Sequence, residues 1–247
     1  MNQSFYTAAV GAWQQQQRLN VHGNNIANVN NYGFKAKRPV FSDLMYGYVQ
    51  GAQQDEMPRG TGAYMVSADT DFHQSGFADT GRALDYAING DGFFALWDPS
   101  SGEYTYTRDG SFTMSQYMLE NGDGELESRW YLSDGLGRFV MGTNGQLIEV
   151  DAEDSTNMAE MLPVGIFDFV NTNGMLSLNE NRFSPIEKNG NLRVGNGKLV
   201  QGKLEQSNAD LANELSKVIE SQRSFTYALK MIQTSDEIET TVNDLRR

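Results

Sequence analysis

Cysteine is absent from this chain of 247 residues, and histidine occurs only twice, at positions 22 and 73. Without cysteine there is no disulfide, no thiol nucleophile and no thiolate zinc site. A histidine-dependent catalytic triad would have to use His22, which lies in a helical pattern, or His73, which lies in a polar run. A structural or solvated role fits each of them better. We therefore expect no metal and no cofactor.

Basic residues are also scarce. Lys and Arg number 19 against 32 Asp and Glu, so the formal net charge is −13. Affinity for nucleic acid or for anionic lipid depends on clustered Lys and Arg, so we expect neither as a partner. No stretch of about 18 apolar residues occurs, so the sequence predicts no transmembrane helix. The opening residues lack the basic start and apolar core of a secretory signal peptide. We expect a protein without membrane insertion, cytosolic or exported by a route that uses no such signal.

The acidity belongs to residues 30–206, which carry −12, while residues 1–29 carry +1 and residues 207–247 carry −2. The first 28 residues contain no proline, and their apolar residues recur every three or four positions. The stripe consists of Phe5, Ala8, Ala12, Leu19 and Ile26, with Gln15 and His22 filling the same seam. This spacing predicts an amphipathic helix of coiled-coil type. With only three large apolar residues, the stripe is too weak to hold the helix alone. An ordinary surface helix on a globular domain is the alternative.

The last forty residues repeat this pattern more strongly. Ser207, or Asn208, followed by Asp210 predicts a capping box at the start of a helix. Apolar positions then step by four and three through Leu211, Leu215, Val218, Gln222, Phe225, Leu229 and Ile232. A capped helix of nearly forty residues exceeds the 8–20 residues usual in globular proteins. Long helices at both termini favour an oligomeric seam, and a helical hairpin within one chain remains the alternative.

The middle of the chain is rich in Asn-Gly and Asp-Gly pairs, among them 89–90, 109–110, 121–122, 134–135 and 144–145. These pairs supply the positive φ that tight hairpin turns require. Short β-favouring runs such as Phe93–Trp97 and Tyr104–Thr107 lie between them. The spacing predicts a twisted antiparallel β domain. The expected fold class is α+β, with segments 1–35 (helix and corner), 36–79 (extended linker or loop), 80–206 (β-rich domain) and 207–247 (helix).

Sequence patterns of catalysis are missing. No phosphate-binding loop, dinucleotide-binding fingerprint or nucleophile elbow occurs. The segment 121–125 resembles a calcium loop in composition only, since it lacks the required Gly and the closing acid. Asp69 and Asp71 form a carboxylate pair of the kind that glycosidases use, but chance pairs are expected among 32 acids. We therefore expect that the protein is not an enzyme and has no catalytic residues.

One segment predicts an abrupt, specified exit from the first helix. Asn28 and its neighbouring asparagines can bond freed backbone groups there, and Gly33 permits a sharp reversal before Phe34. The run Ala27–Lys35 resembles the signature of bacterial flagellar axial proteins, which form the rod, hook and hook-basal body. Residues 89–94, 106–112 and 202–215 resemble further motifs of that family, in family order. Asn31 stands where the family usually has Thr or Ser.

The resemblance implies a structural subunit of the flagellar rod. It implies an inner coiled-coil tube built from both terminal helices, with the β domain outside it, and export through the flagellar type III apparatus. It implies contact with copies of the chain, with neighbouring rod and hook proteins and with the export apparatus, in the basal body outside the cytoplasmic membrane. The sequence does not distinguish a proximal from a distal rod protein.

The residues that we expect to carry assembly are those of the two helical stripes and the corner. They are Phe5, Leu19, Ile26, Asn28, Gly33, Phe34, Leu211, Leu215, Val218, Phe225, Leu229 and Ile232. Two other functions are weighed against this one. A secreted enzyme acting on polysaccharide predicts converging carboxylates in a cleft, and an unrelated trimeric fibre or adhesin predicts a small closed oligomer.

Overall fold

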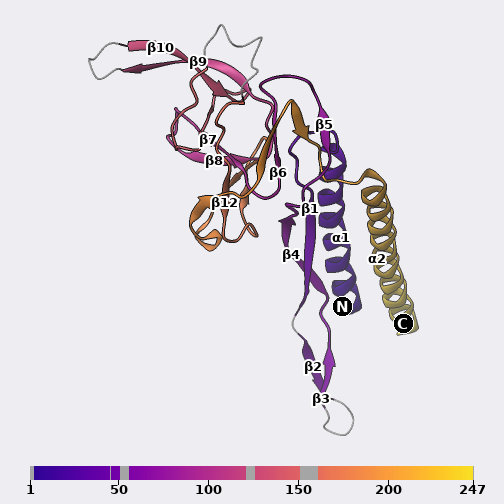
Figure 1. The fold of residues 1–247 in the computed structure, drawn as a ribbon. Coiled ribbons are helices and arrows are strands. Elements are labelled where there is room, and N and C mark those ends of the chain that lie inside the picture. Colours follow the sequence, from indigo (N-terminus) through magenta and orange to yellow (C-terminus); the bar gives the residue numbers. More distant parts are fainter. Residues whose placement is uncertain (1–2, 45, 51–55, 121–125, 151–160, 247) are drawn as a thin grey trace. The chain divides into compact units, whose positions relative to one another are not determined.

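The structure is a computed structural model that describes residues 3–44, 46–50, 56–120, 126–150 and 161–246. The chain divides into two compact units. The helical unit comprises Met1–Ala27, Lys37–Asp69 and Asp210–Arg247, and the β unit comprises Asn28–Ala36 and Thr70–Ala209. The chain therefore passes between the units four times. The expected α+β class is confirmed, with two long terminal helices and a mainly antiparallel β region between them (Figure 1).

The helical unit is built on α1 (Gln3–Ala27) and α2 (Leu211–Leu245), which run antiparallel. Ser4 lies against Ser235 at one end and His22 against Glu214 at the other. Both chain ends therefore lie at the same end of the helix pair (Figure 1). Neither helix, among the residues described, is long and apolar enough to cross a membrane.

The segment expected as a linker, 36–79, instead contains strands. Strand β1 (Lys37–Asp43) pairs with β4 (Ala63–Thr70), and β2 (Gly47–Gln50) pairs antiparallel with β3 (Glu56–Arg59). Polar composition concealed them, because a ribbon open to solvent does not need the apolar alternation of a core strand. A side-chain bond from α1 supports the ribbon, since Gln14 accepts the backbone N–H of Met65 at 2.7 Å.

The β unit is organised around a seven-stranded sheet with the order β13-β14-β8-β7-β11-β10-β9. Its members are β7 (Phe94–Trp97), β8 (Tyr104–Thr107), β9 (Thr113–Glu120), β10 (Leu126–Ser133), β11 (Phe139–Val140), β13 (Leu176–Ser177) and β14 (Arg182–Ser184). Three two-stranded pairs accompany it: β5 (Phe77–Asp79) with β17 (Lys203–Glu205), β6 (Tyr86–Asn89) with β16 (Lys198–Gln201), and β12 (Phe167–Phe169) with β15 (Leu192–Val194). A 3-10 turn, η2, spans Glu187–Asn189.

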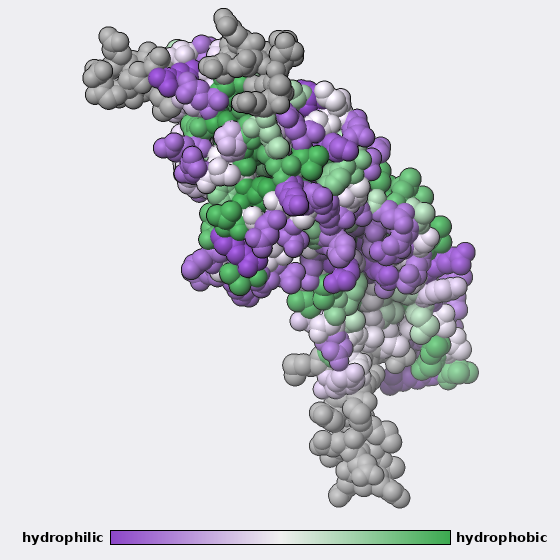
Figure 2. All heavy atoms as spheres, in the orientation of Figure 1, coloured by the Kyte–Doolittle hydropathy of each residue, from purple (hydrophilic) through white to green (hydrophobic). Residues whose placement is uncertain are grey.

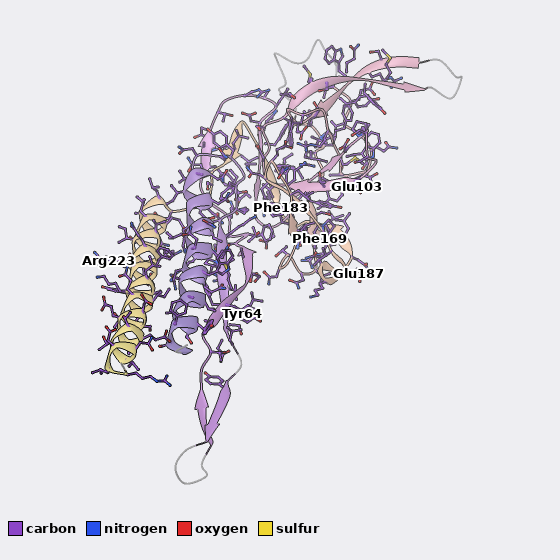
Figure 3. The ribbon with its side chains drawn as sticks, turned by 180° about the vertical axis from the view of Figure 1, so that it is seen from behind. Tyr64, Glu103, Phe169, Phe183, Glu187 and Arg223 are labelled. Carbon is purple, nitrogen blue, oxygen red and sulfur yellow. The ribbon has the colours of Figure 1, made fainter. Side chains whose placement is uncertain are left out.

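The core of the β unit lies on both sides of β7. Side chains alternate along a strand, so Phe94 and Leu96 enter one apolar cluster while Phe93 and Ala95 enter the other. The second cluster also contains Phe169 and Phe183, whose side chains are labelled inside the β unit in Figure 3. A strand that is apolar on both faces must be covered on both, and here the chain itself supplies both coverings.

Two of the expected positive-φ turns are wrong, since neither Gly135 nor Gly110 has positive φ. Asp109-Gly110 was predicted as a positive-φ turn, but Gly110 is not among the residues with positive φ. A Cβ at Gly110 would overlap the carbonyl oxygen of Tyr86. The backbone N–H of Tyr86 also donates to the Gly110 carbonyl at 3.1 Å. The glycine therefore permits close approach of two backbones. The expected turn and calcium-like loop at 121–125 lie outside the described residues.

Candidate assembly surface

The contact between α1 and α2 is centred on buried polar side chains. His22 and Asn25 of α1 and Glu214 of α2 are each at most 5% exposed. Glu214 Oε2 lies 2.6 Å from His22 Nδ1 and accepts a bond from Asn25 Nδ2 at 3.2 Å. Lys217 completes the group with an ion pair to Glu214 Oε1 at 3.2 Å. Removing any one partner would leave a buried polar group unsatisfied, so this cluster fixes the register of the two helices.

The electrostatics of Glu214 follow from these contacts. Burial opposes its ionisation, but the bonds from His22, Asn25 and Lys217 outweigh that effect and hold the pKa of the carboxyl below its ordinary value. Asn25 also makes two hydrogen bonds to the chain after the corner. Its Nδ2 donates to the Lys37 carbonyl at 2.8 Å, and its Oδ1 accepts the Lys37 N–H at 2.9 Å. The same cluster therefore anchors the start of β1 in the helical unit.

The inward stripe of α2 repeats every seven residues. Glu214, Ser221 and Ser235 are buried, and Ala228, the remaining member of the series, is half-buried. Between them Val218, Phe225 and Ile232 are half-buried. Small side chains at one position of each heptad allow two helix backbones to approach closely. Phe5, Leu19 and Ile26 of the expected α1 stripe are likewise half-buried.

The stripe expected on α2, through 211, 215, 218, 222, 225, 229 and 232, lies only partly against α1. Val218, Phe225 and Ile232 are half-buried, whereas Leu211, Leu215 and Leu229 are 40–46% exposed. The inward positions are 214, 221 and 228, each one residue before 215, 222 and 229. Hydrophobicity alone favours leucine over Glu, Ser and Ala at such positions, so the spacing does not single them out. The three leucines lie on a flank of the inward stripe.

Other apolar residues of α2 point away from α1. Tyr227, Met231, Ile238, Val242 and Leu245 are 50–84% exposed. At 100° per residue they fall on the opposite flank from the three leucines. Arg223, labelled in Figure 3, projects from the side of α2 that faces away from α1. We call the exposed apolar residues Leu211, Leu215, Ile219, Tyr227, Leu229, Met231, Ile238, Val242 and Leu245 the outer faces of α2.

The end of α2 extends past α1. The Ser4–Ser235 contact places the start of α1 opposite Ser235, and α2 continues to Leu245. At about 1.5 Å per residue, this extension is about 15 Å long. Ile238, Val242 and Leu245 lie on it and are at least half exposed. Figure 2 shows hydrophobic atoms at this end of α2.

The corner residues lie inside the β unit. Gly33 has φ +65°, donates its N–H to the Glu205 carbonyl at 2.8 Å, and leaves no room for a Cβ beside the Asp109 backbone. Phe34 is 7% exposed. Asn28 accepts a bond from Asn31 Nδ2 at 2.7 Å, which closes the turn. Gly33 and Phe34 were expected at an assembly surface, but both are buried by contacts of the chain itself.

A buried ionic cluster, which the sequence analysis missed, lies beside this corner. Glu205 binds Lys35 Nζ through Oε1 at 2.7 Å and Arg108 Nη1 through Oε2 at 3.2 Å. Lys35 also donates to the His73 carbonyl at 2.8 Å, and Arg108 donates to the Gly90 carbonyl at 2.9 Å. Burial lowers the pKa of Lys35, although Glu205 opposes this. The available signal was the placement of Lys35, Arg108 and Glu205 within three separate motifs.

The start of α2 also differs from its prediction. Asp210 is the N-cap, and its Oδ1 accepts the N–H groups of Ala212 and Asn213 at 3.0 and 3.5 Å. Ser207 lies before the helix and accepts the Ala209 N–H at 3.2 Å. Asn208, the alternative cap, instead accepts the Ala36 N–H at 2.7 Å and donates to the Asp71 carbonyl at 2.7 Å. The helix begins at Leu211 because Asn208 is held in the β unit.

Sites for chemistry are not evident in the described ranges. No group of three His, Asp or Glu residues able to hold a metal occurs there. Asp69 and Asp71 make local bonds, to the Ser67 hydroxyl and to the His73 N–H respectively. His73 is exposed and His22 is buried in the helix contact.

Three family models match successive parts of the chain. The flagella basal body rod protein model matches residues 5–35, the flagellar hook protein FlgE/F/G D1 domain model matches residues 87–152, and the flagellar basal body rod FlgEFG protein C-terminal model matches residues 200–245. Among curated proteins, flagellar basal-body rod protein FlgG of Bacillus subtilis is 33% identical over 100% of both chains. The chain belongs to the flagellar basal-body rod and hook protein family.

Other relatives agree with this membership. FlgG of Buchnera aphidicola subsp. Schizaphis graminum is 32% identical over 95% of this chain and 96% of its own length. The flagellar hook protein FlgE of Borreliella burgdorferi is 33% identical over 58% of this chain and 34% of its own length. As a rod and hook family member with FlgG relatives along its whole length, the chain is a structural subunit of the basal-body rod, in the flagellar basal body.

Membership in the rod and hook family also gives the buried ionic cluster a context. Lys35 lies in the first matched segment, Arg108 in the second and Glu205 in the third. The three segments that identify the family are therefore joined by one buried carboxylate.

Proposed function

We propose that this rod subunit assembles through the outer faces of α2, together with α1, against copies of itself and neighbouring rod and hook proteins. We propose further that the flagellar type III apparatus exports it and that its role is structural rather than catalytic. The exposed apolar residues of α2 that have no cover from α1 carry the first proposal. The relatives, which are named as rod and hook proteins, support the others.

The distribution of side chains on α2 supports assembly. A helix of a finished globular protein turns its apolar stripe inward and its polar residues outward. In α2 the buried residues are Glu214, Ser221 and Ser235, and nine large apolar residues are exposed. Exposed apolar patches of this kind mark protein interfaces. The helix therefore has faces for neighbours beyond α1.

The weakness of the helix pair supports export in an unfolded form. The contact between α2 and α1 rests on one polar cluster, small side chains and half-buried residues. The ion pair Arg18–Glu220 between the two helices is partly exposed. Helical stability in proteins comes mainly from packing of an apolar face, so a pair with little such packing unfolds at low cost. Assembly would then supply the packing that the isolated chain lacks.

The test compares two aspartate substitutions on the outer face with one elsewhere. Met231→Asp combined with Ile238→Asp places charges on an exposed apolar face, so the subunit should fold normally and fail to enter the rod. Asn173→Asp, at an exposed turn beside Gly174, adds negative charge of the same kind without touching α2. Incorporation is measured by quantifying the subunit in purified basal bodies, and folding by far-UV circular dichroism. Normal incorporation of the double variant contradicts the proposal.

A further inference from the structure

A pocket of about 420 Å³ opens in the β unit, and its lining includes no residue of the ionic cluster around Glu205. Three cross-strand pairs line it: Trp97 opposite Tyr104, Tyr131 opposite Glu149, and Met141 opposite Leu147. The volume lies in the range of ligand pockets. Because all six positions are set by strand pairing, the pocket is formed before any ligand arrives.

The aromatic side chains of this pocket are held by a second layer of rings. Trp97 packs on Phe139 with ring centroids 6.3 Å apart and on Tyr117 at 6.2 Å. Tyr131 is 4% exposed and meets Phe139 edge-on at 5.9 Å. Tyr104, by contrast, is 52% exposed. Two rings are fixed by packing and the third presents its surface to solvent.

Among the described residues that line the pocket, the charged one is Glu149. The Glu149 side chain is 47% exposed, and its Oε2 accepts one bond from Arg129 at 3.1 Å. A carboxylate has about four acceptor sites, so this bond leaves room for a second donor. An anionic ligand is therefore disfavoured.

We propose that this pocket binds a lysine or arginine side chain of a neighbouring protein. Cations bind the faces of Trp and Tyr rings, and several rings with a nearby carboxylate form the recognised cage for ammonium groups. Trp97 and Tyr104 supply exposed ring surface, the buried Tyr131 ring forms part of the wall, and Glu149 supplies the opposite charge. The rod and hook family assembles from proteins, so the inferred cation is a side chain rather than a free amine. The pocket lies outside the α2 faces, so this inference stands or falls separately from assembly through α2.

The test uses two probes of the same shape that differ in charge. Choline carries a trimethylammonium group, and 3,3-dimethyl-1-butanol carries a neutral tert-butyl group in its place. Binding to the full chain is followed by NMR through the indole N–H of Trp97. We expect choline to bind about tenfold more tightly than the neutral analogue, because only the cation is attracted by the rings and the carboxylate. Lysine amide should bind at the same place.

Variants locate the interaction. Tyr104→Leu removes a ring face at an exposed position and should weaken choline binding about fivefold, and Glu149→Gln should weaken it about threefold. Glu103→Gln is the matched control, since Glu103 is exposed beside Tyr104 and does not line the pocket (Figure 3). Equal binding of the two probes, binding of an N-acetylglucosamine oligomer without choline, or equal losses in E103Q and E149Q would each overturn the proposal.

Discussion

The two units of this chain differ in where they place their apolar side chains. The β unit buries aromatic and aliphatic residues on both faces of β7 and pairs its buried charges around Glu205. The helical unit buries Glu214, Ser221 and Ser235 of α2 and exposes large apolar residues such as Met231 and Leu245. A unit of the first kind is complete within one chain. We expect a unit of the second kind to be completed by neighbours.

The largest effect is expected in the β unit, from Glu205→Ala. This change leaves Lys35 and Arg108 buried without a counter-charge, and breaking a buried pair in this way costs about 3–5 kcal/mol. Loss of the acceptor also affects the Ser75 N–H, which donates to Glu205 Oε1 at 3.1 Å. Hydrogen exchange of peptides from β6 and β7 measures the loss of local stability.

The control for this variant is Glu103→Ala, an exposed acid in the same unit. Surface changes of this type stay within about 0.5 kcal/mol. If E205A lowers protection in the β unit no more than E103A does, the ionic cluster does not hold the unit together.

A smaller effect is expected at the start of α2, in the helical unit. Asp210→Ala removes the side chain that accepts two N–H groups and should destabilise the helix by about 1 kcal/mol. Ser207→Ala, three residues earlier, should leave the helix unchanged, because the Ser207 hydroxyl accepts the N–H of Ala209, which lies before the helix. Hydrogen exchange of residues 211–220 compares the two. Equal losses of hydrogen-exchange protection in the two variants would contradict Asp210 as the N-cap of α2 and favour Ser207.

Periodicity and turn composition carry the prediction of the architecture. The stripes from Phe5 to Ile26 and from Leu211 to Ile232 predict both helices, and runs such as Tyr104–Thr107 predict strands that the structure contains. These signals are local, because each follows from the spacing of residues within one element. The resemblance of short motifs to the flagellar family extends the prediction to function, since the matched models cover the same segments.

Contacts between distant segments could not be predicted from the sequence, because its signals are local to each element. Nothing near Lys35 in the sequence indicates that Glu205 neutralises it, and nothing near Glu214 indicates that His22 lies within hydrogen-bond distance of its buried carboxyl group. The burial of Glu214 in place of Leu215 on α2 has a related origin. Hydrophobicity selects Leu215 over Glu214 as the buried residue, and only the partner helix reverses that choice.

The smallest expected effect is a difference in how the stability of the two units depends on pH. Bonds to His22, Asn25 and Lys217 lower the pKa of Glu214 against the opposing effect of burial, so its contribution is present above its ordinary pKa and is lost as the pH falls through the lowered value. Burial raises the pKa of Asp109 in the β unit. Its contribution is therefore present below its ordinary pKa and is lost as the pH rises through the raised value.

Acidification below about pH 4.3, the ordinary pKa of a glutamate, should therefore weaken the helical unit first. Hydrogen-exchange protection of α2 should fall toward that of Glu214→Gln, which does not titrate. Protection of the β unit should rise relative to Asp109→Asn as the pH falls through the raised pKa of Asp109 towards its ordinary value. We expect small changes, because one proton is involved at each site and the helix pair is partly open to solvent. Parallel responses of the two units would remove the electrostatic part of the contrast between them and leave only the difference in apolar burial.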